Sequence, residues 1–391
     1  MLPFAVAAAF LVLGYLRYAL GTAHPDDYLA DAWEHLRFSD VIWLWVRDSG
    51  ASHPVPYLDH WFEYPVLLGG LIYLLGFAPS LGAYFALTYA VLAGCALATI
   101  ALLRRLPGAD PWYLAAAPAL YLYTGLNWDT AAIAATAAAL VAFDRGRDRW
   151  GTIALVAAVW LKFFPLVFLA AILVERLRRG RRRAALEIAG LFALGSLVVN
   201  LPVLLAAPGR WADFFTFNRD RAADSNLWVL ARDIPTSTVN ALSLAALAIG
   251  GLGLAVLALR SRRSVVPPLG AALLLWWLAI NKVFSPQYAL WVFFALAVLR
   301  PSWSLWTALV AADLAAYAVG FFVQYALHRP EGGPFADWQI RHLYDPLQVL
   351  RVGLLLLAIG SGMRLLLQEE GALPAASMTV TGIGGKHRGE P

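Results

Sequence analysis

The chain has 391 residues, of which 61% are hydrophobic and only 14% are charged. A soluble domain of this length carries roughly 25% charged residues. Apolar runs of about 20 residues, each long enough to cross a bilayer, recur along the whole chain. The formal net charge of +5 comes from short arginine-rich clusters between these runs. That pattern is typical of cytoplasmic loops and gives no indication of nucleic-acid binding, so the sequence predicts an all-α, multi-pass membrane protein.

The N-terminal part is expected to contain a membrane span, a long outer loop and a second span. Residues 2–20 lack a basic leader and a cleavage site, so they predict a retained first span that runs outward from the cytoplasm. Residues 21–63 then form the long outer loop. The apolar stretch 65–77 is too short to span comfortably and predicts a juxtamembrane helix on the outer surface. A full-length span follows over 82–103.

Two short helical hairpins are predicted in the middle of the chain. Residues 111–123 and 130–143 form the arms of the first hairpin, and residues 152–161 and 165–174 form those of the second. Each arm has about 10–15 residues, or roughly 15–22 Å of helix. Pro165 supplies the break in the second hairpin, because proline lacks a backbone donor and disfavours helix before it. Arginine clusters on either side place both hairpin tips toward the outer face.

The second half of the chain is expected to complete one membrane domain, residues 1–367, with about 12 membrane helices, several short or broken. The further spans are expected over 185–206, 238–259, 266–280, 288–299, 303–323 and 347–367. The aromatic segment 210–228 predicts an interfacial helix or a lid in an outer loop. The Gly-rich tail 368–391 is expected to be disordered in the cytoplasm.

Lysine is scarce in this chain, which has 30 basic residues but only three lysines. Lys162 and Lys282 both fall within apolar segments. Burying a cation in the bilayer costs at least about 2.5–3.5 kcal/mol, so such residues usually face a partner or a cavity. The alternative is that each side chain reaches to the nearest interface. Both lysines are predicted near the outer ends of short helices, beside other polar groups.

These polar groups predict a cavity at the outer leaflet, where lysines and carboxylates converge. Lysine can hold phosphate oxygens as a point charge, and a carboxylate can take a proton from an attacking hydroxyl. The alternative for Asp129 is a structural hydrogen bond at the tip of the first hairpin. Besides Lys162 and Lys282, the residues expected to bind substrate around this cavity are Asp59, His60, Glu63, Tyr64, Asn127, Asp129, Gln287 and Tyr288, with Asp40 beside them.

No metal or cofactor is indicated. Asp27, Asp31 and His35 would share one face of a helix, but such an acidic face is more often solvated than metal-binding. The sequence contains no Walker-type loop, no GxGxxG and no CxxC motif. Cys95 is the only cysteine, so no disulfide framework is expected.

Five segments in this order resemble polyprenyl-phosphate-sugar-dependent glycosyltransferases of the C superfamily. The closest resemblance is to bacterial family 87, which includes mannosyltransferases of actinobacterial cell envelopes. The resemblance covers about residues 1–300. The matching segments are FSDV (38–41), PVPYLDHWFEYPVL (54–67), NWDTAA (127–132), LKFFPLVFL (161–169) and FSPQYALW (284–291).

The resemblance implies a specific reaction at the outer face of the plasma (inner) membrane. Asp40 matches the family's general base, and the Lys282 loop lies where the family contacts the lipid phosphate. The donor would be a sugar on a polyprenyl monophosphate, with mannose the first expectation and arabinose, glucose or galactose open. The acceptor would be an envelope glycolipid or polysaccharide, and the anomeric centre would invert. Asp26 and Asp27 lie nearer the first span, where related families place their acid, but only Asp40 has the matching context FSDV.

Two other functional classes remain open from the residues alone. Broken helices and charges within the membrane are also features of transporters, including flippases of lipid-linked sugars. A non-catalytic scaffold of envelope synthesis is the third alternative, and it predicts that Asp40, Lys162 and Lys282 can be replaced without consequence.

Overall fold

The computed structural model describes residues 1–261, 264–329 and 332–367. Within these ranges the regular secondary structure is helical, with two isolated β-bridges and no strand. The all-α prediction is therefore confirmed. The predicted disordered tail, 368–391, lies outside the described residues.

Six helices in the described ranges are long and apolar enough to cross a membrane. This confirms the prediction of a multi-pass membrane protein. Two of the six, α11 and α13, expose most of their apolar side chains, as expected of helices that face lipid. The six are α1 (Leu2–Ala19) with its 3-10 extension to Ala23, α5 (Leu81–Leu103), α11 (Arg182–Ala206), α13 (Thr236–Leu259), α16 (Trp303–Leu327), and the continuous segment from α17 (Gly333–Gln339) into α18 (Asp345–Leu367).

Shorter helices form the interior of the bundle. Helix α8 packs on α5 and α9, and α10 and α18 both pack on α14. Every residue of α15 is buried, so this helix has no lipid or solvent face of its own. These helices are α8 (Asp129–Asp144), α9 (Asp148–Leu161), α10 (Leu166–Arg178), α14 (Val266–Ile280) and α15 (Ala289–Leu299).

The second predicted hairpin is confirmed, with α9 and α10 separated at Lys162 and with Pro165 as the N-cap of α10. The first hairpin differs from the prediction. Its first arm is not one helix but two, α6 (Trp112–Ala115) and α7 (Ala119–Tyr123). Pro118 separates them, because it offers no backbone donor and disfavours helical backbone in the residue before it.

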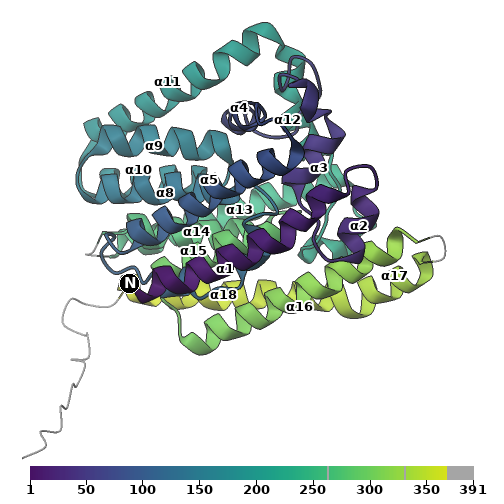
Figure 1. Ribbon diagram of the computed structural model, residues 1–391. Coiled ribbons are helices and arrows are strands. Elements are labelled where there is room, and N and C mark those ends of the chain that lie inside the picture. The colour runs from purple at the N-terminus through teal and green to yellow at the C-terminus, as the bar shows by residue number, and fades with distance from the viewer. Residues whose placement is uncertain (262–263, 330–331, 368–391) are drawn as a thin grey trace, which may run out of the picture.

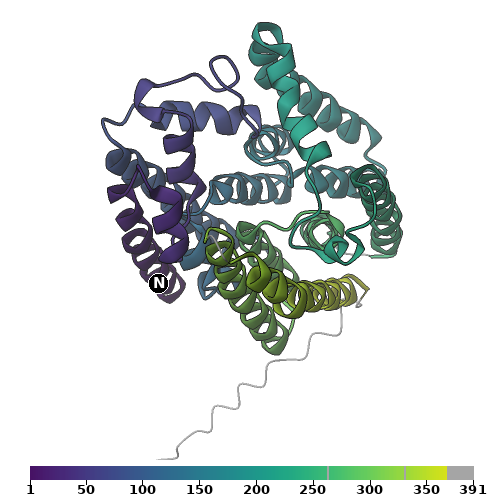
Figure 2. The ribbon, with the colours of Figure 1, turned by 90° about the vertical axis from the view of Figure 1, so that its right-hand side faces the viewer.

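Segments from three of the connections between predicted spans lie at the end of the bundle opposite the N-terminus (Figure 1). They contain α2 (Tyr28–Glu34), α3 (Asp40–Arg47), α12 (Pro208–Asp220) and α17. Seen from that end, the N-terminal, middle and C-terminal parts of the chain occupy three different sides (Figure 2). The predicted helix within 65–77 is α4 (Val66–Leu75), which at ten residues is too short to span alone.

Candidate active site

A cavity of about 940 Å³ is formed between these three parts of the chain. Its wall combines both buried lysines with carboxylates and many aromatic side chains. The structure thereby brings together most of the residues singled out from the sequence. Those that line the cavity are Asp40, Glu63, Tyr64, Lys162, Lys282, Gln287 and Tyr288.

Asp40 is the first residue of α3, and main-chain contacts fix its position. Ser39 caps the helix by accepting a hydrogen bond from the backbone N–H of Ile42, at 3.4 Å. The N–H of Asp40 donates to the carbonyl of Leu126 at the tip of the first hairpin, at 2.8 Å. The neighbouring residue 125 is glycine, where a Cβ would lie 2.6 Å from the ring of Tyr18, so the hairpin tip also packs closely against α1. The N-terminus of α3 and the hairpin tip therefore form one unit.

The Asp40 carboxylate is held by two polar side chains. The Asn127 amide donates to its Oδ2 at 2.7 Å, and the Tyr64 hydroxyl lies 3.5 Å from the same oxygen. Loss of hydration raises the pKa of Asp40 from its ordinary 3.8 to about 6, while the Asn127 hydrogen bond and the charge of Lys162 act in the opposite direction. A carboxylate with this pKa is mostly ionised at neutral pH and is a better proton acceptor than an ordinary aspartate.

Lys162 is the residue where the chain leaves α9, at the end of the helix that favours a positive charge. Its Nζ donates to Asp129 Oδ2 at 3.1 Å and to Asn127 Oδ1 at 3.3 Å. The ammonium also lies over the rings of Tyr64 and Tyr288. Lys162 is thus a buried, paired cation in the cavity wall.

Asp129 and Asn127 lie behind the cavity wall, where both are fully buried. Asp129 opens α8, and its second oxygen accepts a hydrogen bond from the indole of Trp291 at 2.7 Å. Asp129 therefore holds Lys162 and Trp291 together, which agrees with the structural alternative considered from the sequence. Trp291 was not singled out from the sequence, because an apolar helix containing a tryptophan gives no sign of its partner.

Lys282 also lines the cavity, in the connection between α14 and α15. Its Nζ donates to the carbonyl of Arg219 in the last turn of α12, at 2.7 Å. The backbone carbonyl of Lys282 accepts from the N–H of Asp224 at 2.9 Å. Lys282 therefore closes the end of α12 and is still part of the cavity surface. Loss of hydration lowers its pKa from the usual value.

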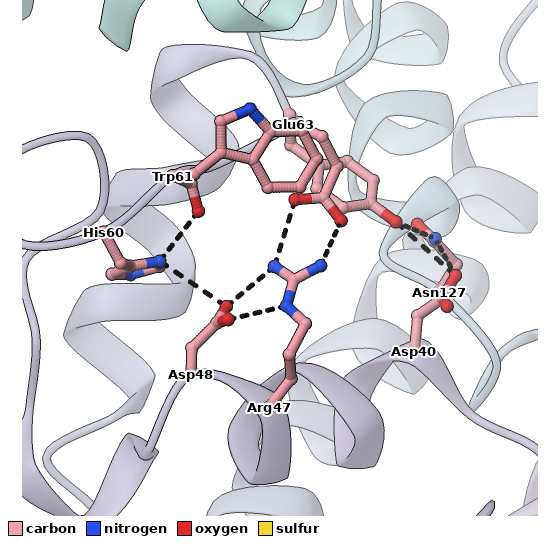
Figure 3. A network of polar contacts seen from close by, with 8 residues as sticks. Asp40, Arg47, Asp48, His60, Trp61, Glu63 and Asn127 are labelled. Atoms are coloured by element: carbon pink, nitrogen blue, oxygen red, sulfur yellow. Dashed lines mark hydrogen bonds and ion pairs between the residues drawn. The ribbon is translucent and has the colours of Figure 1, made fainter. Parts of the chain in front are cut away.

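Asp59 and His60 do not line this cavity, although the sequence led us to expect them around it. Asp59 is exposed and accepts a hydrogen bond from the N–H of Val55, at 2.7 Å. His60 contacts the carbonyl of Trp61 and lies 3.7 Å from Asp48 (Figure 3). Both side chains shape the outer segment around residues 55–61, away from Asp40.

The other acidic residues of the first outer loop are separate from the cavity. Asp26 and Asp27, the alternative acids, are exposed and do not line it. The Asp31 carboxylate is bound by the guanidinium of Arg37 and lies 3.2 Å from His35. No cluster of three or more candidate metal ligands occurs in the described ranges.

Aromatic side chains that the sequence does not mark individually complete the wall. Phe163 and Phe164 follow Lys162, and Phe214 and Phe215 come from α12. Phe164 packs edge-on against Tyr288, with ring centres 4.5 Å apart. On another side of the cavity, Trp33 stacks on Phe38 at 4.4 Å. The cavity thus offers apolar surface beside each of its charged groups.

The chain matches no protein-family model, and no curated protein shows significant sequence similarity to it. The fold and the site define a helical membrane protein with a large polar and aromatic cavity. The resemblance to family 87 glycosyltransferases remains an expectation from the sequence segments given above.

Proposed function

We propose that this protein is an inverting glycosyltransferase that moves a sugar, with mannose the first expectation, from a polyprenyl monophosphate to an envelope glycolipid or polysaccharide. The observation that carries the proposal is the convergence of Asp40, whose pKa is about 6, with Lys162 on one cavity of about 940 Å³. A base and a cation on a shared cavity suit a reaction in which a hydroxyl attacks and a phosphate leaves.

Each step of the proposed reaction can be assigned to one of these residues. The acceptor hydroxyl donates its proton to Asp40 as its oxygen attacks the anomeric carbon. The bond between that carbon and the phosphate oxygen breaks on the opposite face, so the configuration inverts. The phosphate leaves with its lipid, and the positive charges of Lys162 and Lys282 on the cavity surface favour its growing negative charge. Asn127 and Tyr64 orient the base throughout.

The apolar wall suits the lipid of the donor. Phe163, Phe214 and Phe215 form a cluster of tilted and edge-on ring contacts between the hairpin of Lys162 and helix α12. An isoprenoid chain can pack on such a surface while its phosphate stays near the lysines. The aromatic pair Trp33 and Phe38, on another side of the cavity, offers a flat surface for a sugar ring.

The orientation in the membrane is part of the proposal. The cavity faces the outside or periplasm, and the arginine-rich turns face the cytoplasm. The six long helices, the shorter interior helices and the α6–α7 arm together make about 12 membrane helices, several short or broken.

The function is tested with purified protein in liposomes, using polyprenyl-phosphate-mannose labelled in the sugar and crude envelope lipids as acceptor. We expect a labelled glycolipid or glycan. Failure of the mannose, arabinose, glucose and galactose donors alike would reject the transferase. Movement of the intact donor across the bilayer without transfer would instead identify a flippase. Mass spectrometry of envelope glycolipids with and without the gene would then identify sugar and acceptor together.

The topology gives a second prediction. A thiol introduced by Ser52→Cys, near the predicted outer end, should react with an impermeant maleimide in intact cells. A thiol introduced by Arg145→Cys, in the turn between α8 and α9, should react with the maleimide only after the membrane is permeabilised. Both positions are exposed. The unsubstituted protein, with Cys95 alone, is the control, and the reverse labelling pattern would invert the proposed orientation.

A further inference from the structure

Arg47 binds two carboxylates at the end of helix α3. Its guanidinium donates to both oxygens of Glu63, at 2.7 and 3.0 Å, and to both oxygens of Asp48, at 2.6 and 2.9 Å (Figure 3). Such paired contacts fix the direction as well as the distance of the partners. The Arg47 side chain is 26% exposed and Glu63 is 13% exposed, so the pair is partly shielded from water. The guanidinium also lies near the ring of Trp61.

Two structural connections link the Arg47–Glu63 pair to the proposed base. Arg47 is on the same short helix as Asp40, and Glu63 immediately precedes Tyr64, whose hydroxyl lies 3.5 Å from Asp40. The backbone carbonyl of Tyr64 also accepts a hydrogen bond from the Tyr57 hydroxyl at 2.6 Å. Helix α3 and the segment 61–64 are therefore joined at both ends of the helix, once by the ion pair and once by Tyr64 and Asp40.

We propose that Arg47 is a positioning residue for the transfer reaction: it holds the segment 61–64 on α3, so that Tyr64 stays against Asp40, and it compensates the charge of Glu63 beside the base. The inference rests on the proposed function for the meaning of Asp40 as a base. It assigns Glu63 a role different from the one expected from the sequence, because both of its carboxylate oxygens are bound by Arg47.

The charge of Glu63 acts directly on Asp40. Glu63 raises the pKa of Asp40, and Lys162 lowers it. Without Arg47, Glu63 would act on Asp40 uncompensated, and the pKa of Asp40 would rise. A general base works in its deprotonated form, so a higher pKa moves the acid limb of the rate profile to higher pH. The titratable and charged groups that face Asp40 are Tyr18 on α1, Tyr28 on α2, Glu63 and Tyr64 on the outer segment, Asp129 on α8 and Lys162 after α9.

The test is the pH dependence of transfer in a set of charge variants. For the unsubstituted protein the acid limb should lie near pH 6, following the pKa of Asp40. In Arg47→Gln it should move up by at least about half a pH unit, and the plateau rate should fall several-fold. Arg47→Lys keeps the positive charge but cannot make the same two-point contacts with the carboxylates. The acid limb of its rate profile should therefore stay at the original pH, while its plateau rate should remain below that of the unsubstituted protein.

The double variant Arg47→Gln with Glu63→Gln distinguishes an electrostatic effect of Arg47 on Asp40 from a general structural disturbance of the site. Removing both charges should return the acid limb to within about 0.2 pH units of the original position. A merely structural role would lower the rate in every variant and leave the limb in place, which would overturn the proposal. If Arg47→Gln does not fold, Glu63→Gln alone should move the limb to lower pH, and an unmoved limb there also overturns it. Arg183→Gln, which removes an exposed ion pair on α11, is the matched control.

An infrared titration of the Asp40 carboxyl keeps this inference separate from the proposed function. The band is assigned by its loss in Asp40→Asn, and its midpoint is followed in the unsubstituted protein and in Arg47→Gln without any substrate. A shifted midpoint in a protein that transfers no sugar would reject the transferase and keep only the effect of Arg47 on the protonation of Asp40. A protein that transfers sugar but shows no shift in the midpoint or the rate profile would reject the role of Arg47.

Discussion

Asp40→Asn should lower the rate of sugar transfer roughly 100- to 10,000-fold and leave donor binding within about threefold. The amide has the shape of the carboxylate and can still accept the Asn127 hydrogen bond on its oxygen, at the position now 2.7 Å away. It cannot accept the proton of the acceptor hydroxyl. The loss should therefore appear in kcat and not in the affinity for polyprenyl-phosphate-mannose, measured separately by equilibrium binding in nanodiscs.

Asp59→Asn is the matched control for this experiment. Asp59 belongs to the same outer loop and loses the same charge, but it is exposed and does not line the cavity. Its rate should stay within twofold of the original. A full transfer rate in Asp40→Asn would remove the central residue from the proposed mechanism, and Asp26 and Asp27 would become the acids to test next.

Asp129→Ala should destabilise the fold by about 3–5 kcal/mol, because it leaves a buried cation without its partner. Lys162 would lose the contact at 3.1 Å, and the indole N–H of Trp291 would lose its acceptor at 2.7 Å. Asp129 is fully buried, so water cannot take over either contact without rearrangement. Unfolding of the purified protein in mixed micelles, titrated with a denaturing detergent, measures the effect.

Two further variants identify the cause of this loss. Adding Lys162→Met to Asp129→Ala removes the unpaired charge and should recover more than half of the lost free energy of unfolding, although transfer activity should remain low. Glu187→Ala breaks an exposed ion pair with Arg183 and should cost no more than about 1 kcal/mol. An effect of Asp129→Ala as small as that of Glu187→Ala would show that the buried pair contributes little to the fold.

Much of the helical organisation could be predicted from the sequence, since apolar runs indicate helices and prolines indicate where helices begin or break. The predicted span 238–259 is close to α13 (Thr236–Leu259), and the break at Pro165 was expected. The break at Pro118 is harder to predict, because it lies inside a 13-residue apolar run whose other residues are all compatible with helix. The arrangement of the helices around the cavity depends on packing between distant segments, and no local pattern encodes it.

The candidate site was predictable where a residue was unusual for its surroundings. Lys162 stands out as a lysine in an arginine-rich, apolar chain, and Asn127 and Asp129 stand out at a hairpin tip. Their mutual contacts could not be predicted, because Asn127 and Lys162 are 35 residues apart. Arg47 carries no such signal, since an arginine in a polar loop is ordinary and its partner Glu63 is 16 residues away.

The attachment of Asp40 to the hairpin tip has a consequence for how such a protein diverges. The N–H of Asp40 donates to the carbonyl of Leu126, and the Ser39 hydroxyl donates to the carbonyl of Gly125 at 2.5 Å. Both acceptors belong to the peptide backbone, so most side-chain replacements in the hairpin leave them in place. Residues 49–55 of the outer loop, which make none of these contacts, can therefore accumulate substitutions and insertions while Asp40 keeps its position. The outer surroundings of the cavity can thus diverge between related proteins while Asp40, the proposed base, stays where the peptide backbone places it.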